Sequence, residues 1–170
     1  MSIAANNLIA LGTIFRREVR RITRIWTQTL IPPAITMTLY FVIFGTLIGS
    51  RIGEIHAGFS YMQFIVPGLV MMSIIQNSYG NITSSFFGSK FGRYVEEMLV
   101  SPMPSWVILS GYVLGAMVRG LAVGIIVTII ALFFTSLQVT HPLVVISTAL
   151  LTSIVFSLAG FINAVFAQNF

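Results

Sequence analysis

The sequence predicts an all-α fold, a polytopic membrane helix bundle in which an interfacial amphipathic helix precedes four transmembrane helices. Its 170 residues are 56% hydrophobic and only 8% charged, whereas soluble domains carry about 25% charged residues. The apolar residues fall into long runs that match the roughly 20 residues needed to cross a hydrocarbon core. The few charged residues gather in an N-terminal arginine cluster and in one later loop. We therefore expect a single transmembrane domain over residues 1–170.

Residues 3–26 predict a helix that lies in the membrane interface. On a helical wheel Phe15, Val19, Ile22 and Trp26 cluster within an arc of roughly 60°. The opposite side carries five basic residues: Arg16, Arg17, Arg20, Arg21 and Arg24. This pattern favours an apolar face in the lipid and guanidinium groups at the phosphates, and it is also compatible with a plain orientation signal. Trp26 marks the point where the chain is expected to enter the bilayer.

Four apolar runs predict the membrane spans: 28–48, 61–87, 105–134 and 143–162. Pro32 and Pro33 fall near the start of the first span, where a missing backbone N–H costs least. The third run is longer than one span needs, so it tilts or projects from the bilayer. Its glycines form two small-xxx-small pairs: Gly111, Gly115, Gly120 and Gly124. Such pairs allow close helix approach, within one chain or at a dimer seam.

Polar side chains share one face of the second span and are too costly to place against lipid. They are Asn77, Asn81, Ser84 and Ser85. Two interpretations stay open for this face: hydrogen bonds between helices, or the lining of a transport path. Arg119 is the single charge inside a predicted span. It could reach the cytoplasmic phosphates, pair inside the bundle or meet a substrate.

The loop between the second and third spans predicts a short amphipathic helix over residues 90–101. One face carries apolar residues at helical spacing: Phe91, Tyr94, Val95, Met98 and Leu99. The other carries most of the charges: Lys90, Arg93, Glu96 and Glu97. Pro102 and Pro104 then end the helix, because proline removes a donor and disfavours helix in the preceding residue. A helix held at the bilayer surface is accessible to a soluble partner, so we expect a docking element.

The distribution of basic residues predicts the orientation of the bundle. The N-terminal arginines, Lys90 and Arg93 fall on one side, and Arg51 alone falls on the other. The positive-inside rule therefore predicts a cytoplasmic N-terminus and a cytoplasmic loop. There is no cleavable signal of the usual form, which favours retention in a membrane.

Several kinds of chemistry lack their signatures in this sequence. There is no phosphate-binding Gly-x-x-x-x-Gly-Lys-Ser/Thr, no metal-ligand spacing and no nucleophile–base set. The net charge of +5 reflects arginines beside membrane segments and suits anionic lipids better than nucleic acid. We expect no enzyme activity, no nucleic-acid binding and no cofactor bound by this chain itself.

The order of these parts resembles the membrane subunit of type-2 ABC exporters. The resemblance rests on FRREVRRITRIW leading directly into the first span, and on the cytoplasmic loop GRYVEEMLVSPMPSWVILSGYVLG. In that family the loop is the coupling helix, which sits in a groove of a separate ATPase subunit, and the N-terminal helix lies beside it. The implied ATPase contact comprises Phe91, Arg93, Tyr94, Glu96, Glu97, Met98, Leu99 and Ser101. The family usually has six spans where this sequence offers four, so it represents a fragment or a shortened relative.

The resemblance implies a permease subunit that exports an amphiphile, lipid, drug or polysaccharide across a bacterial inner membrane. ATP and Mg²⁺ would bind to the partner ATPase, and a second permease chain would complete the path, in a homodimer. Two other functions stay open from the residues alone. One is a non-transporting membrane anchor that docks a soluble protein, and the other is a secondary carrier or channel.

Overall fold

The structure is a computed structural model, and it describes residues 3–49, 54–56, 59–137 and 139–167. These residues are almost entirely helical, apart from one short antiparallel hairpin. In chain order the elements are α1 (Ile3–Arg24), α2 (Trp26–Val42), the π-helical turn η1 (Ile43–Ile48), β1 (Glu54–His56), β2 (Phe59–Ser60), α4 (Tyr61–Phe91), α5 (Tyr94–Val100), α6 (Ser105–Leu132) and α7 (Pro142–Phe166). The all-α class is thus confirmed. Arg51, on which part of the predicted orientation rests, lies outside the described residues.

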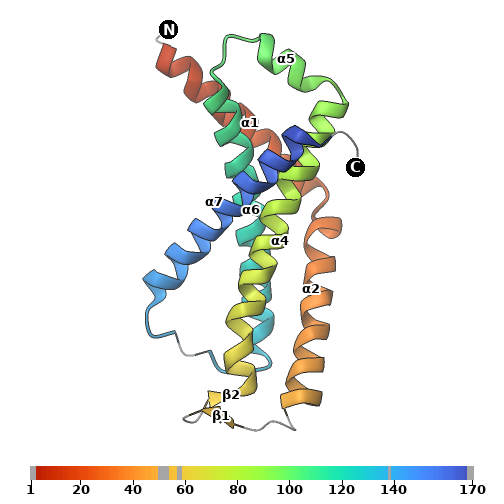
Figure 1. Ribbon diagram of the computed structural model, residues 1–170, viewed down its shortest axis with the longest axis vertical. Helices are drawn as coiled ribbons and strands as arrows, with labels where there is room; N and C mark the ends of the chain where they lie inside the picture. The colour runs from red at the N-terminus through yellow and green to blue at the C-terminus, as the bar shows by residue number, and fades with distance from the viewer. Residues whose placement is uncertain (1–2, 50–53, 57–58, 138, 168–170) are drawn as a thin grey trace.

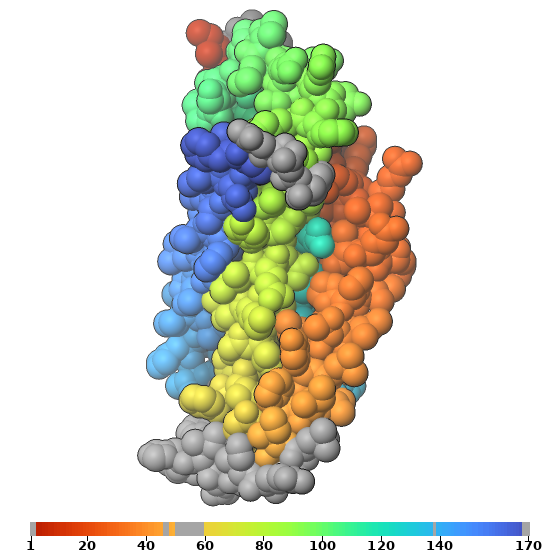
Figure 2. All heavy atoms as spheres, turned by 45° about the vertical axis from the view of Figure 1, so that its right-hand side comes forward, coloured from red at the N-terminus to blue at the C-terminus, as the bar shows by residue number. Residues whose placement is uncertain are grey.

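Helix α4 runs along the centre of an elongated bundle and packs mainly on α6 and α7 (Figure 1). Helix α1 crosses obliquely against α6, and α2 descends beside the bundle. Both termini and α5 lie at one end, which we call the α5 end, and β1 and β2 lie at the other, the hairpin end. In the space-filling view α2 and α4 run side by side along the molecule (Figure 2).

Two apolar clusters form the core, one toward each end. The cluster of the α5 end contains Ile14, Ile82, Phe86, Val107, Ile108, Tyr112, Val113, Ala116 and Ala164. The cluster of the hairpin end contains Met37, Phe41, Met62, Val66, Val123, Val127 and Ala131. In the first, the Phe86 ring lies 4.4 Å from the Phe161 ring and 5.4 Å from the Tyr112 ring. These contacts fix α4, α6 and α7 against one another at the α5 end.

The small residues of α6 serve packing inside this chain. A Cβ on Gly120 would lie 1.9 Å from the Ser78 hydroxyl oxygen, so α4 and α6 approach closely there. A Cβ on Gly115 would lie 2.4 Å from the Glu18 Cβ, so α1 approaches α6 in the same way. Within the described residues, these glycines therefore act as intrachain contact points.

Among the described residues, three helices are long and apolar enough to cross a membrane: Trp26–Gly45, Ser105–Leu132 and Pro142–Phe166. They correspond to the first, third and fourth predicted spans. The second predicted span lies in α4, which at 31 residues is long enough but carries many polar side chains. Helix α2 begins at Trp26, so Pro32 and Pro33 lie inside it, deeper than the first turn.

The predicted loop helix differs from the observed one at its start. Helix α4 continues through Phe91, the chain breaks at Gly92 and Arg93, and α5 begins only at Tyr94. Arg93 adopts the left-handed conformation, with φ 59° and ψ 9°. The prediction places the start at residue 90 because Lys90 and Phe91 continue the helical spacing. Periodicity cannot detect that the backbone of a single residue, Arg93, leaves the right-handed helical conformation.

Candidate functional site

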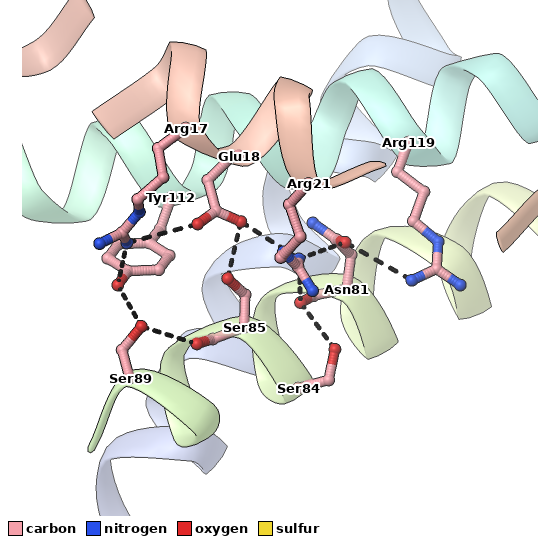
Figure 3. A network of polar contacts seen from close by, with 9 residues as sticks. All are labelled: Arg17, Glu18, Arg21, Asn81, Ser84, Ser85, Ser89, Tyr112 and Arg119. Carbon is pink, nitrogen blue, oxygen red and sulfur yellow. Dashed lines mark hydrogen bonds and ion pairs between the residues drawn. The ribbon is translucent and has the colours of Figure 1, made fainter. Parts of the chain in front are cut away.

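The candidate site lies at the α5 end and has two parts, a buried polar network and the exposed surface of α5. The network joins α1, α4 and α6 (Figure 3). Its members are Arg17, Glu18, Arg21, Asn81, Ser84, Ser85, Ser89, Tyr112 and Arg119.

Glu18 is the centre of the network. It is 1% exposed and lies on the buried stripe of α1, between Ile14 and Ile22. Its carboxylate accepts hydrogen bonds from Arg21 Nη2 at 3.1 Å, from Arg17 Nη2 at 3.4 Å and from the Ser85 hydroxyl at 2.6 Å. A buried carboxylate is tolerable only when it is paired in this way. The carboxylate thereby ties α1 to α4.

Asn81 connects two further cations to the network. It is also 1% exposed, and its Oδ1 accepts from Arg21 Nη2 at 2.8 Å and from Arg119 Nη1 at 3.5 Å. Figure 3 shows the Asn81 amide between the two guanidinium groups. One neutral oxygen of α4 thus serves an arginine of α1 and an arginine of α6.

Tyr112 closes the network on the α6 side. Its hydroxyl accepts a hydrogen bond from Arg17 Nη2 and donates one to the Ser89 hydroxyl at 2.8 Å. The Arg17 guanidinium also lies 5.2 Å from the centre of the Tyr112 ring, within cation–π range. The Ser89 hydroxyl donates in turn to the Ser85 carbonyl oxygen at 3.0 Å. The chain of contacts therefore runs from α1 through α6 and back to α4.

The polar face predicted on the second span divides in two. Asn81 and Ser85 bond to α1, whereas Asn77 donates to the Ser73 carbonyl oxygen and Ser84 donates to that of Asn81, both within α4. Arg119 takes part through Asn81. In this arrangement the face makes contacts within and between helices.

The N-terminal arginines also divide. Arg16, Arg17, Arg20 and Arg24 are exposed, as is Trp26, and Arg21 is partly buried. Of the five arginines, Arg17 and Arg21 turn their guanidinium groups to Glu18. The wheel placed all five arginines on a lipid-phosphate face, and it took no account of the one carboxylate among them. That carboxylate, flanked by arginines at positions i−1 and i+3, was the available signal.

Helix α5 presents apolar residues outward at the end of the bundle. Of the predicted docking residues, Phe91, Arg93, Tyr94, Glu96, Glu97 and Leu99 are exposed, while Met98 and Ser101 are partly buried. Phe91 is 82% exposed and Val100 is 89% exposed. Val95 and Met98 pack on the apolar cluster of the α5 end, which seats α5 on the bundle. Val100 is a further exposed apolar residue that the prediction omitted.

No group of three or more histidine, cysteine, aspartate or glutamate side chains is placed to hold a metal ion among the residues that the structure describes. The arrangement contains cations, hydroxyls and one neutralised carboxylate. Its chemistry is therefore that of hydrogen bonding and charge recognition.

Comparison with known proteins identifies the family. Residues 9–170 match the sequence model of the ABC-2 type transporter family. Over 162 residues the chain is 60% identical to the inner membrane transport permease YadH of Escherichia coli K12, covering 95% of this chain and 63% of the relative. The same values hold for YadH of Escherichia coli O157:H7 and of Shigella flexneri. The chain thus spans a little under two thirds of the length of these curated relatives. No solved structure gives a significant match. Because the family model matches nearly the whole sequence, this membrane chain belongs to the ABC-2 type transporter family.

Proposed function

We propose that the chain is the membrane-spanning permease part of an ATP-driven exporter in a bacterial inner membrane. Membership of the ABC-2 type family supports this proposal, as does its 60% identity to proteins named inner membrane transport permeases. ATP and Mg²⁺ bind to a separate ATPase subunit, and two permease chains pair around the path. The N-terminus and α5 face the cytoplasm.

The observation that carries the proposal is the exposed surface of α5. A seven-residue helix with no buried residue is a poor structural element by itself, because short helices are marginal without packing. Here it projects at the end of the bundle with Tyr94, Leu99 and Val100 exposed beside Glu96, and Phe91 at the end of α4 is exposed as well. Exposed apolar residues with charged neighbours are typical of a protein docking surface. The groove of an ATPase subunit is the occupant we propose.

Helix α4 completes the membrane domain as a fourth span. Its buried polar side chains bond to neighbouring helices or within α4, while Gln76 and Ser84 are exposed. The Ser78 hydroxyl, for example, shares a hydrogen bond of 2.8 Å with Ser153 of α7. A helix whose polar groups are satisfied by its neighbours can cross a bilayer despite its composition.

The mechanism follows from the position of α5 between α4 and α6. Closure of the ATPase pair on ATP moves α5, and the two long helices that flank it transmit the movement through the bundle. The permease therefore needs no nucleotide site of its own. It needs rigid helices on either side of α5 and a helix packing that is stable in two arrangements. The mixture of polar and aromatic side chains suits an amphiphilic cargo such as a lipid, a drug or a lipid-linked polysaccharide.

The test is copurification of an ATPase subunit with the tagged permease. We expect the double change Glu96→Lys and Glu97→Lys to reduce ATPase recovery strongly, because both carboxylates are exposed on α5. A control introduces two lysines at another adjacent exposed pair, Thr27 and Gln28 at the start of α2; it adds two positive charges without removing a carboxylate and should leave recovery unchanged. Equal recovery with both double variants would refute α5 as the docking element.

Transport must then be measured separately from docking. In vesicles that contain both subunits, ATP-dependent flux is expected with the unchanged permease and not with the α5 double variant. Docking without any flux would instead favour a membrane anchor, and flux without ATP would favour a secondary carrier.

A further inference from the structure

An open cavity of about 490 Å³ lies beside the network, between α1, α4 and the start of α5. Its lining is almost wholly polar or glycine: Arg17, Glu18, Arg21, Ser84, Ser85, Gly88, Ser89 and Tyr94. Gly88 leaves the wall open, since a Cβ at that position would meet no atom within 4 Å. The cavity therefore has room for a small ligand, with the polar groups of Arg17 and Arg21 at its wall.

Both guanidinium groups of the cavity retain unused donors. Arg17 and Arg21 make all their hydrogen bonds to described residues through Nη2, so Nη1 of each has no protein acceptor, whereas Arg21 Nε also lacks an acceptor but is buried away from the cavity. An arginine carries five N–H donors in a planar fork, which suits tetrahedral oxyanions. The only carboxylate of the lining, Glu18, already accepts three hydrogen bonds. The free hydrogen-bonding capacity of these charged groups is thus that of donors.

The charge around the cavity is not balanced by protein groups. The carboxylate of Glu18 pairs with Arg17 and Arg21, and Arg119 joins the network outside the cavity wall, through Asn81, so the network as a whole has an excess of two positive charges. Among the described residues, Arg119 has no carboxylate within ion-pair distance, and its Nε is buried without an acceptor. It shares the Asn81 oxygen with Arg21. Such a cluster costs free energy unless an anion compensates it.

We propose that this cavity is a binding site for a phosphate group. A phosphate carries up to two negative charges and several acceptor oxygens, which match the excess charge and the unused donors of Arg17 and Arg21. The group could belong to an anionic lipid headgroup or to a soluble phosphate, and both present the same oxygens. Tyr94 belongs to α5, so a bound phosphate contacts α1, α4 and the proposed docking helix at once. The proposal does not depend on transport.

The first experiment measures thermal unfolding of the purified chain in a phosphate-free, zwitterionic detergent. Sodium phosphate should raise the melting temperature in a saturable manner, and sodium chloride at the same ionic strength should not. If both salts raise the melting temperature equally, the effect is general screening of the arginine charges, and the proposal is overturned.

The cavity is tested by filling it without disturbing the network. Gly88→Leu places a side chain in open space at the cavity wall, and Gly80→Leu, two turns away on α4, does the same outside the cavity. Both changes replace a helical glycine, so their effects on helix propensity cancel. We expect Gly88→Leu to weaken phosphate binding about tenfold or more, the effect of losing one charge-assisted hydrogen bond. Equal affinities in the two variants would refute the site.

The variant Arg119→Gln distinguishes a role of Arg119 in phosphate binding from a role in stabilising the fold. Removing this charge should stabilise the phosphate-free protein, because Arg21 then loses a cationic neighbour, and should diminish the stabilisation by phosphate. A purely structural role of Arg119 predicts the opposite sign for the phosphate-free protein.

The source of the phosphate is distinguished in nanodiscs of phosphatidylcholine with and without phosphatidylglycerol. If phosphatidylglycerol is retained by the unchanged chain, lost from Gly88→Leu and competes with inorganic phosphate, the ligand is a lipid headgroup. If inorganic phosphate binds equally in both nanodiscs, the ligand is soluble. Absence of binding in both would overturn the proposal.

Discussion

Replacement of Glu18 by glutamine tests whether one buried carboxylate holds α1 on the bundle. The change keeps the size of the side chain and removes its charge. An amide oxygen in the place of Oε2 can still accept from Ser85 and Arg21, but the amide nitrogen that replaces Oε1 is a donor and cannot accept from Arg17. Two partly exposed guanidinium groups thereby lose their charged partner, which is itself buried.

The expected loss follows from burial and distance. Removing one partner of a buried ion pair costs about 3–5 kcal/mol. Glu18 is 1% exposed and its arginine partners lie at 3.1 and 3.4 Å, but their side chains are 33% and 45% exposed. Water therefore compensates part of the lost attraction, and we expect the lower end, about 3 kcal/mol in the free energy of unfolding.

The assay is denaturant unfolding in bicelles, followed by circular dichroism. Glu97→Gln is the matched control, since it makes the same chemical change on the exposed face of α5 and should stay within about 0.5 kcal/mol of the unchanged chain. A second readout is possible because the sequence contains no cysteine. A single Ile14→Cys probe on the buried face of α1 should react with maleimide faster when Glu18→Gln is present. A Glu18→Gln protein as stable as Glu97→Gln, with unchanged labelling, would refute the reasoning.

Three other substitutions test the packing and the backbone. Gly120→Ala should lower the free energy of unfolding by about 1–3 kcal/mol because its Cβ meets Ser78, whereas Gly80→Ala, which meets nothing, should be neutral or stabilising; equal unfolding curves would contradict the close contact of α4 and α6. Arg93→Gly should stabilise the chain by about 0.5–1 kcal/mol, since glycine accepts a φ of 59° without strain, and a loss of stability would show that the Arg93 side chain matters more than its backbone. Lys90→Met should speed amide hydrogen exchange in the last turn of α7, whose carbonyl groups accept from the ammonium group, and unchanged exchange would mean that this cap is dispensable.

The helices of this bundle could be predicted because each long apolar run leaves the chain few alternatives in a membrane. The start of α5 could not be predicted as well, because Arg93 reverses the backbone without glycine or proline at its own position. The polarity of α4 was visible in the sequence, but its partners were not. Ser85 meets Glu18 across 67 residues of sequence, and periodicity reports only which face of a helix is polar.

The same limit explains why the buried network was missed. A wheel of α1 assigns the arginines to one broad face, and only the approach of α6 decides which of them turn inward. That approach is possible because Gly111 and Gly115 present no side chain to α1. The glycines were recognised as contact points, but a glycine pair does not identify its partner. The tertiary contact therefore assigns Arg17 and Arg21 roles different from that of Arg16.

The network connects α1 to the two helices that flank α5. Ser85 lies near the end of α4 that leads into α5, and Tyr112 lies near the start of α6 that follows α5. Both are connected to Glu18 or Arg17 of α1. If an ATPase docks on α5 as we propose, a force applied there would reach α1 through side chains on the two helices that flank α5. Glu18→Gln, combined with intact docking at α5, should therefore reduce ATP-dependent flux more than it reduces ATPase copurification. Equal losses of docking and flux would place the network in the support of α5 itself, and not in transmission beyond it.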